Sequence, residues 1–153
     1  MVNKKDCAWL ASWIENITDS KKYVGFSGSS KIKAKSDLQK FEKARELKSI
    51  IENVRKNYIS KMKSVDMRER QLGTATYIID FLAIRAGNEK GSDEADTVGC
   101  CSLWKEHVRL GENFKVFFKF LGKDSIEYNN EVVVTELAYS NIKHFLSEKQ
   151  EKD

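Results

Sequence analysis

The chain has 153 residues, carries a net charge of +4, and is 41% hydrophobic and 33% charged. Such a length and composition are typical of one folded, soluble domain and not of a disordered tail. No apolar run approaches the about 20 residues that cross a bilayer, and the N-terminus leads into no apolar signal region, so we expect an intracellular chain with no membrane partner.

The N-terminal third combines a predicted strand with a strongly basic stretch. Residues 7–13 alternate apolar and small side chains, which predicts a short strand. Residues 25–30 read Gly-Phe-Ser-Gly-Ser-Ser and are the best candidate for a boundary. Residues 21–63 hold 13 Lys/Arg and only 4 Asp/Glu. This excess is typical of a nucleic-acid partner, although a solvated helix face would give the same count.

Two long helices are predicted next. Ser36 and Gln39 form a capping-box pattern, so we expect the first helix to begin there. Its apolar positions step by three and four residues: Leu38, Phe41, Ala44, Leu47, Ile51, Val54 and Tyr58. The second helix is predicted over residues 67–86, is apolar on several faces, and should be covered by neighbours. Gly87 suits a left-handed cap, which places Arg85 in the last helical turn.

Beyond residue 96 the apolar period changes to two, as in strands. The predicted strands are residues 97–104, 114–120 and 125–128, followed by a turn at 129–130 and an apolar run at 132–134. A turn at residues 122–124 places Lys123 at the tip of a hairpin, and a last helix is predicted over residues 136–149. The sequence therefore predicts an α+β fold, in which long helices pack around a small three-stranded antiparallel sheet.

One apparent ATPase signature carries no function here. Residues 93–96 read Asp-Glu-Ala-Asp, as in a family of helicases. That chemistry needs a G-x-x-x-x-G-K-[ST] loop to cradle the nucleotide phosphates, and the sequence contains none. We therefore exclude ATP hydrolysis.

The cysteines and histidines indicate no metal site. Cys100 and Cys101 are adjacent, Cys7 stands alone, and no C-x-x-C spacing occurs. We expect small buried thiols, no metal and no cofactor. His107 and His144 lack metal-ligand spacing and are expected to pack or to lie on the surface.

Two cations occupy unusual places. Arg85 stands in the last turn of an apolar helix and must either find an anion or reach water, and Lys123 stands at a hairpin tip. A structural interpretation exists for each, because a cation stabilises the partially negative end of a helix and a turn lysine can simply be solvated.

The residues around both cations resemble the core of eukaryotic DNA topoisomerase I, the type IB enzymes. Residues 82–90, Leu-Ala-Ile-Arg-Ala-Gly-Asn-Glu-Lys, resemble the arginine motif, and residues 95–103 follow as in the family. Residues 120–126, Phe-Leu-Gly-Lys-Asp-Ser-Ile, resemble the hairpin of the catalytic lysine. Residues 29–33 fall where the family hinges its clamp. The likeness covers about residues 7–150.

The resemblance implies an ATP-independent isomerase that relaxes supercoiled double-stranded DNA in the nucleus. A tyrosine would cleave one strand through a 3′-phosphotyrosyl intermediate, and the reverse reaction would reseal it, with no cofactor. Arg85 would stabilise charge on the non-bridging phosphate oxygens, which its two-pronged guanidinium suits. Lys123 would be the general acid to the leaving 5′-oxygen, since a minor groove about 6 Å wide admits a thin hairpin.

The resemblance also implies which parts this chain lacks. Other positions implied to hold DNA or to orient the lysine are Asn88, Lys90, Thr97, Asp124, Lys31 and Lys33. The family's second arginine, its histidine and its nucleophilic tyrosine match no residue here, so we expect a fragment that is inactive alone and needs the remaining subdomains. Residues 1–30 would end the preceding core subdomain and hinge, and residues 31–153 would form the N-terminal part of the catalytic core subdomain.

Two other interpretations stay open. Arg85 and Lys123 could serve only affinity in a DNA-binding module, or could belong to a tyrosine recombinase, which shares both residues. The extended match from the hinge to the third strand favours the topoisomerase. Two departures from the family are Gly28, where proline is usual, and a loop at residues 91–94 that is about one residue shorter; neither involves Arg85 or Lys123.

Overall fold

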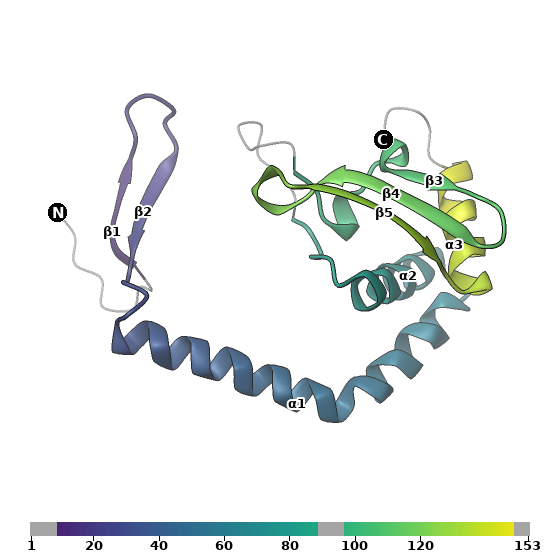
Figure 1. The fold of residues 1–153 in the computed structure, drawn as a ribbon, viewed down its shortest axis with the longest axis horizontal. Helices are drawn as coiled ribbons and strands as arrows, with labels where there is room; N and C mark the ends of the chain where they lie inside the picture. Colours follow the sequence, from purple (N-terminus) through teal and green to yellow (C-terminus); the bar gives the residue numbers. More distant parts are fainter. Residues whose placement is uncertain (1–8, 89–96, 149–153) are drawn as a thin grey trace. The chain divides into compact units, whose positions relative to one another are not determined.

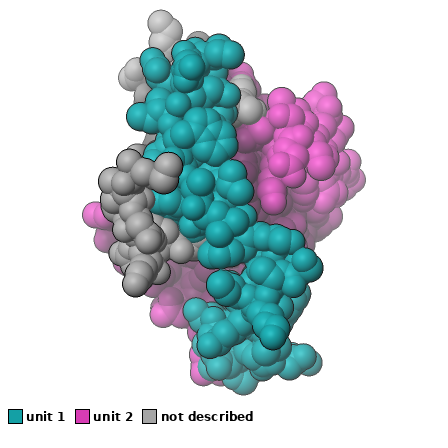
Figure 2. All heavy atoms as spheres, turned by 90° about the vertical axis from the view of Figure 1, so that its left-hand side faces the viewer, with its two compact units in different colours: residues 1–51 teal, residues 52–153 magenta. Residues whose placement is uncertain are grey.

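The computed structural model describes residues 9–88 and 97–148. It contains two compact units, Met1–Ile51 and Glu52–Asp153, which we call the N-terminal and C-terminal units (Figure 2). The boundary between them falls inside the first helix, and each unit is described by itself. In the described part, no helix is long and apolar enough to cross a membrane.

The N-terminal unit contains a hairpin followed by most of a long helix. Strand β1 (Trp9–Ile14) pairs antiparallel with β2 (Lys21–Gly25), and α1 (Lys31–Met62) follows (Figure 1). The predicted first strand is therefore confirmed over its described residues. Strand β2 was not predicted, because its sequence Lys-Lys-Tyr-Val-Gly offers too few apolar positions to show a period.

Helix α1 begins at Lys31 and not at Ser36, so the predicted start was wrong. Ser30 is its N-cap: the Lys33 N–H donates to Ser30 Oγ at 3.1 Å, and the Ala34 N–H donates to the Ser30 carbonyl at 2.9 Å. Residues 31–35 are good helix formers, so the helix extends back to the first available cap. Ser36 lies inside the helix and caps nothing.

The C-terminal unit packs helices against a three-stranded antiparallel sheet, which confirms the predicted α+β class. The sheet has the order β3 (Val108–Leu110), β4 (Lys115–Leu121), β5 (Glu127–Val133). Helices α2 (Met67–Leu82) and α3 (Glu136–Glu148) cover one face of it (Figure 1). Val116, Phe118 and Phe120 alternate along β4 and are buried in the core, as their period predicts.

One strand prediction and one turn prediction were wrong. Residues 97–104 contain a 3₁₀ turn, Cys100–Ser102, in place of a strand. The Ser102 hydroxyl accepts a hydrogen bond from the Gly99 N–H at 3.0 Å, and such local bonds compete with strand pairing. The predicted turn at residues 129–130 is part of β5, because Asn129 and Asn130 pair with β4 and this pairing overrides their local turn preference.

A buried amide joins three helices of the C-terminal unit. The Asn141 side chain of α3 is only 5% exposed, and its Nδ2 donates to the Met62 carbonyl of α1 and to Thr74 Oγ1 of α2, each at 3.0 Å. Gly73 allows α2 to approach α1 closely, since a Cβ there would lie 2.7 Å from the Met62 nitrogen. The end of α1 is thus held by the hydrogen bond from Asn141 and by the close helix contact that Gly73 permits.

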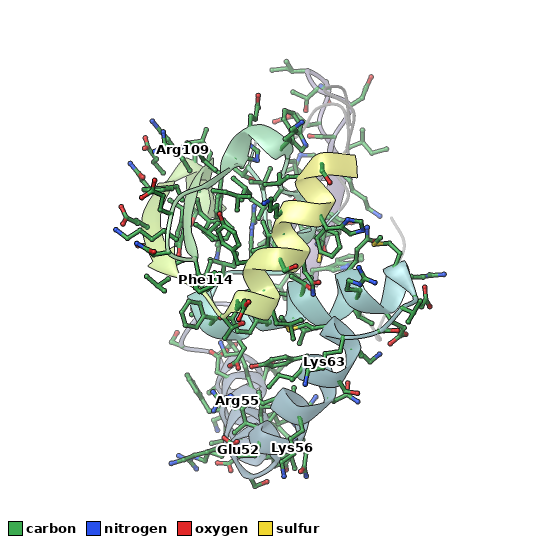
Figure 3. All side chains as sticks on the ribbon, turned by 90° about the vertical axis from the view of Figure 1, so that its right-hand side faces the viewer. Glu52, Arg55, Lys56, Lys63, Arg109 and Phe114 are labelled. Carbon is green, nitrogen blue, oxygen red and sulfur yellow. The ribbon has the colours of Figure 1, made fainter. Side chains whose placement is uncertain are left out.

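An ion pair between α1 and α2 reinforces this packing. Arg55 Nε donates to Asp80 Oδ2 at 3.0 Å, and the Tyr58 hydroxyl donates to the same oxygen at 2.9 Å. Figure 3 shows Arg55 beside Glu52 on α1, and Arg55 Nη1 also lies 3.0 Å from Glu52 Oε1. The Arg55 guanidinium lowers the pKa of the Asp80 carboxyl, so the carboxylate form is stabilised in the fold.

Asn141→Leu should lower the free energy of unfolding by about 1–3 kcal/mol, because it leaves the buried Met62 carbonyl without its donor. Urea unfolding of the chain measures this loss. Asn129→Leu on the exposed side of β5 is the matched control and should change stability by less than about 0.5 kcal/mol. Equal losses in the two variants would contradict the role of Asn141.

Asp80→Asn should destabilise the chain at pH 7 by about 1 kcal/mol, since the ion pair is partly exposed. The pKa of Asp80 lies below its ordinary value of 3.8, so its contribution is full above that value and is lost as the pH falls through the folded-state pKa. The difference in Tm between wild type and variant should therefore shrink from pH 7 to pH 2. A difference that stays constant over this range would contradict the account.

Candidate functional site

Arg85 lies outside the helix that was predicted to hold it. Helix α2 ends at Leu82, and Ala83 takes the left-handed conformation with φ 53°. The predicted helix end at residue 86 was wrong because the carbonyls of this segment find partners elsewhere. The Cys100 N–H donates to the Arg85 carbonyl at 2.9 Å, and the Cys101 N–H donates to the Ala86 carbonyl at 2.7 Å. The sequence gives no local sign of this pairing.

The Arg85 guanidinium is held by two neutral oxygens. Its Nη2 donates to Thr97 Oγ1 at 2.9 Å, and its Nε lies 3.4 Å from the Val98 carbonyl oxygen. Within residues 9–88 and 97–148, no carboxylate forms an ion pair with it. A guanidinium has five N–H donors, so these contacts orient the group and leave donors available for an anion.

Lys123 stands at the tip of the hairpin between β4 and β5, as its turn pattern predicts. The Gly122 N–H donates to the Ile126 carbonyl at 2.8 Å and closes the hairpin. Asp124 and Ser125 both adopt left-handed conformations, with φ 59° and 58°. Non-glycine residues rarely do so, which makes this a strained turn. The Lys123 side chain is exposed.

The structure brings Arg85 and Lys123 to one cavity. This cavity, of about 250 Å³, is lined by Ile84, Arg85, Val98, Gly99, Phe120, Gly122, Lys123, Ile126, Glu127 and Tyr128. Its one carboxylate, from Glu127, lies 3.8 Å from the ammonium of Lys119. Two cations from separate parts of the chain therefore converge on a partly apolar cavity, an arrangement that suits an anion attached to an apolar or aromatic group.

A second cavity adjoins Arg85. It has a volume of about 330 Å³ and is lined by Arg85, Ala86, Gly87, Asn88, Thr97, Gly99 and Ser102. Two of the predicted DNA-binding residues, Asn88 and Thr97, thus lie beside Arg85. A third, Asp124, follows Lys123 at the hairpin tip.

The remaining predicted DNA-binding residues are not among those that line these cavities, or lie outside the described residues. Lys31 and Lys33 are in the first turn of α1, in the N-terminal unit, and Lys33 Nζ lies 3.0 Å from Asp37 Oδ1. Lys90 lies outside the described residues, as does the Asp-Glu-Ala-Asp segment at residues 93–96.

Tyr128, which its sequence pattern does not single out, lines the cavity of both cations. Its ring stacks on Phe120 at 4.9 Å between centroids, and its hydroxyl accepts a hydrogen bond from Asn130 Nδ2 at 3.1 Å. The available signal was its position: Tyr128 pairs with Phe120 across the hairpin that carries Lys123. From its sequence context, this residue was predicted to be part of a strand and not to be the nucleophilic tyrosine.

Histidine and cysteine predictions were partly confirmed. His107 packs as expected: its ring stacks on Trp104, and its Nδ1 accepts a hydrogen bond from the Trp104 N–H at 3.0 Å. The centroid of the His144 ring lies 6.2 Å from that of the Phe145 ring. Cys100 is buried, but Cys101 is exposed, because the 3₁₀ turn directs the two side chains differently. Cys7 lies outside the described residues, and the described ones include no cluster of three or more His, Cys, Asp or Glu that could hold a metal.

Comparisons with known proteins identify the family. The family model of the eukaryotic DNA topoisomerase I catalytic core matches residues 29–153. DNA topoisomerase 1 of Schizosaccharomyces pombe is 56% identical over 137 residues, or 90% of this chain. The Candida albicans protein of the same name is 51% identical over 92% of the chain, and rat mitochondrial DNA topoisomerase I is 50% identical over 95%. The chain spans 17%, 18% and 26% of these three relatives.

A thiol reagent at pH 8 should label Cys101 and spare Cys100 in a Cys7→Ser variant. Burial raises the pKa of the Cys100 thiol to about 12, so little thiolate forms there. Mass spectrometry of the digested chain measures the site of labelling, and a Cys101→Ser variant in the same background should remain unlabelled. Preferential labelling of Cys100 would contradict the described turn.

Proposed function

Because the chain belongs to the eukaryotic DNA topoisomerase I family, we propose that it is part of a type IB topoisomerase that relaxes supercoiled double-stranded DNA. Arg85 and Lys123 are its catalytic residues and act on one phosphodiester. One observation carries the proposal: the two cations line one cavity, and among described residues neither is paired with a carboxylate. A cation that is oriented but not neutralised retains its attraction for phosphate.

Arg85 stabilises the negative charge that develops on the non-bridging oxygens in the transition state. Thr97 and Val98 accept from one side of its guanidinium, so the group is already oriented before DNA binds. A preorganised donor of this kind stabilises a transition state by about 3 kcal/mol. Arginine suits the task because two of its N–H groups can bind two oxygens at once.

Lys123 donates a proton to the leaving 5′-oxygen. Its place at the tip of a narrow hairpin lets the side chain enter a minor groove about 6 Å wide, which would exclude a helix. A general acid contributes about 10²- to 10⁴-fold to such a step. Asp124 follows it in the strained turn, and its role is to orient the lysine.

Asn88 and Thr97 bind the phosphates next to the one that reacts. Both line the cavity beside Arg85, where a neutral donor can contact the backbone of the same strand. Lys31, Lys33 and Lys90 add attraction for the DNA backbone, which does not depend on sequence.

The nucleophilic tyrosine, a second arginine and a histidine come from the remaining subdomains of a longer polypeptide. Residues 1–30 end the preceding core subdomain, and residues 31–153 form the N-terminal part of the catalytic one. The enzyme acts in the nucleus without a cofactor or a membrane partner, although one relative is named mitochondrial. Bond energy is conserved in the phosphotyrosyl link, so ATP is not required.

The test is a chimera in which this chain replaces the matching segment of the Schizosaccharomyces pombe relative. Arg85→Ala should slow single-turnover cleavage at saturating DNA by about 10²- to 10³-fold, and Lys123→Ala by about 10²- to 10⁴-fold, while the Kd for DNA stays nearly unchanged. Arg85→Lys should remain strongly impaired, because an ammonium cannot replace the guanidinium fork. Lys115→Ala, an exposed lysine of β4 whose partner Glu131 lines neither cavity, is the matched control and should cleave normally.

The same measurements separate catalysis from DNA holding. A holding role predicts weaker binding and a salt slope reduced by about one for each lost phosphate contact, with normal cleavage at saturation. That result would contradict the proposal. The 153-residue chain alone should neither cleave nor relax DNA, and relaxation by it would contradict the assignment of the nucleophile to another subdomain.

A further inference from the structure

Gly87 and Gly99 are in contact where the segment that holds Arg85, residues 85–88, crosses the segment that holds Thr97, residues 97–101. A Cβ placed on Gly99 would lie 2.4 Å from the Gly87 nitrogen and 2.5 Å from the Gly87 Cα. These are backbone atoms that cannot turn away as a side chain can. Gly87 is restricted as well, since its φ is +88° and its own Cβ would lie 2.9 Å from the Gly99 Cα. Only glycine permits this approach at Gly99.

The crossing controls the position of Arg85 through four hydrogen bonds. The N–H groups of Cys100 and Cys101 donate hydrogen bonds to the carbonyls of Arg85 and Ala86. Thr97 and Val98 accept two further hydrogen bonds from the Arg85 guanidinium. Backbone and side chain of Arg85 are thus held by the same short segment. A displacement of that segment moves the guanidinium or removes its acceptors.

The same segment is also bonded to the strand that carries Lys123. The Val98 N–H donates to the Leu121 carbonyl at 2.8 Å, two residues before Lys123. Residues 97–101 are therefore bonded to the segment of Arg85 on one side and to the end of β4 on the other. A shift of this segment at Gly99 would change the position of Arg85 relative to the end of β4.

We propose that Gly99 is a positioning residue, whose missing side chain places Arg85 in register with Lys123. The consequence for catalysis rests on the proposed function, whereas the effect on the guanidinium does not. A displacement of about 1 Å in a reacting constellation can slow a reaction by about 10²-fold. An added Cβ at Gly99 requires a shift of this size, since the nearest backbone atom would be 2.4 Å away.

Gly73 provides a matched control for a purely structural role. A Cβ there would lie 2.7 Å from the Met62 nitrogen and 2.8 Å from the Tyr58 carbonyl oxygen, again backbone atoms. This clash lies at the crossing of α1 and α2 and involves no residue of either cavity. Gly73→Ala should lower Tm as Gly99→Ala does, without moving Arg85.

The first experiment uses the chimera with Gly99→Ala and with Gly73→Ala, at a temperature where both are folded. Gly99→Ala should slow single-turnover cleavage by about 10²-fold, with the Kd for DNA within about threefold of wild type. Gly73→Ala should cleave within about twofold of wild type. Equal cleavage rates in the two glycine variants would overturn the proposal.

The second experiment needs no DNA and uses the 153-residue chain. The Arg85 Nε–H proton should exchange slowly with solvent in NMR spectra, because it is bonded to Val98, and its signal is assigned by its loss in Arg85→Lys. Gly99→Ala should speed this exchange by about tenfold, the factor expected for one lost hydrogen bond, and Gly73→Ala should not. Unchanged exchange in Gly99→Ala would overturn the proposal even if Arg85 proved catalytic.

If Gly99→Ala does not fold, the Thr97→Val variant tests whether residues 97–101 hold the Arg85 guanidinium. It removes the acceptor of Arg85 Nη2 without adding a clash, so Arg85 Nε–H exchange should again become faster. Unchanged exchange would show that the Thr97 hydroxyl does not help to hold the guanidinium, and would overturn this part of the proposal. If instead Arg85→Ala cleaves normally in the chimera while Gly99→Ala still speeds exchange, the proposed function fails and the positioning role stands.

Discussion

The site depends on a short segment, residues 97–101, that is hydrogen-bonded on both of its sides. On one side it binds the backbone of Arg85 and Ala86, and on the other the Val98 N–H binds the end of β4 at Leu121. Helix α2 stops at Leu82, so the helix itself does not aim the arginine. The rest of the C-terminal unit supports this arrangement: the core fixes β4, and the buried amide of Asn141 fixes the three helices behind it.

Arg85 and Lys123 differ from Arg55 and Lys115 in what surrounds them. Arg55 is neutralised by Asp80 and Glu52, and Lys115 lies 2.6 Å from Glu131 on the exposed face of the sheet. Arg85 contacts only a hydroxyl and a carbonyl among the described residues. An internal carboxylate would satisfy Arg85 and weaken its attraction for phosphate, whereas neutral acceptors orient the guanidinium and preserve its charge. Within the described residues, the arrangement therefore favours an external anion.

The sequence predicted the class of fold and the place of Lys123 at a hairpin tip, whereas the predictions failed where distant segments pair. The alternation of Val116, Phe118 and Phe120 was enough to place β4, and Gly122 with Lys123 was enough to place the hairpin. The end of α2 could not be predicted, because the bonds that replace its last turn come from Cys100 and Cys101. Asn129 and Asn130 have turn preferences that cross-strand pairing with β4 overrides. The role of Gly99 depends on a backbone approach that local pattern does not record.

The most direct test of the central claim removes charge from the substrate. A duplex with a methylphosphonate at the scissile position lacks one charged non-bridging oxygen, so a guanidinium has less charge to stabilise there. If Arg85 acts on that phosphate, Arg85→Ala in the chimera should be impaired at least about tenfold less on this substrate than on the natural one. An equal impairment on both substrates would show that Arg85 acts elsewhere, and would contradict the account.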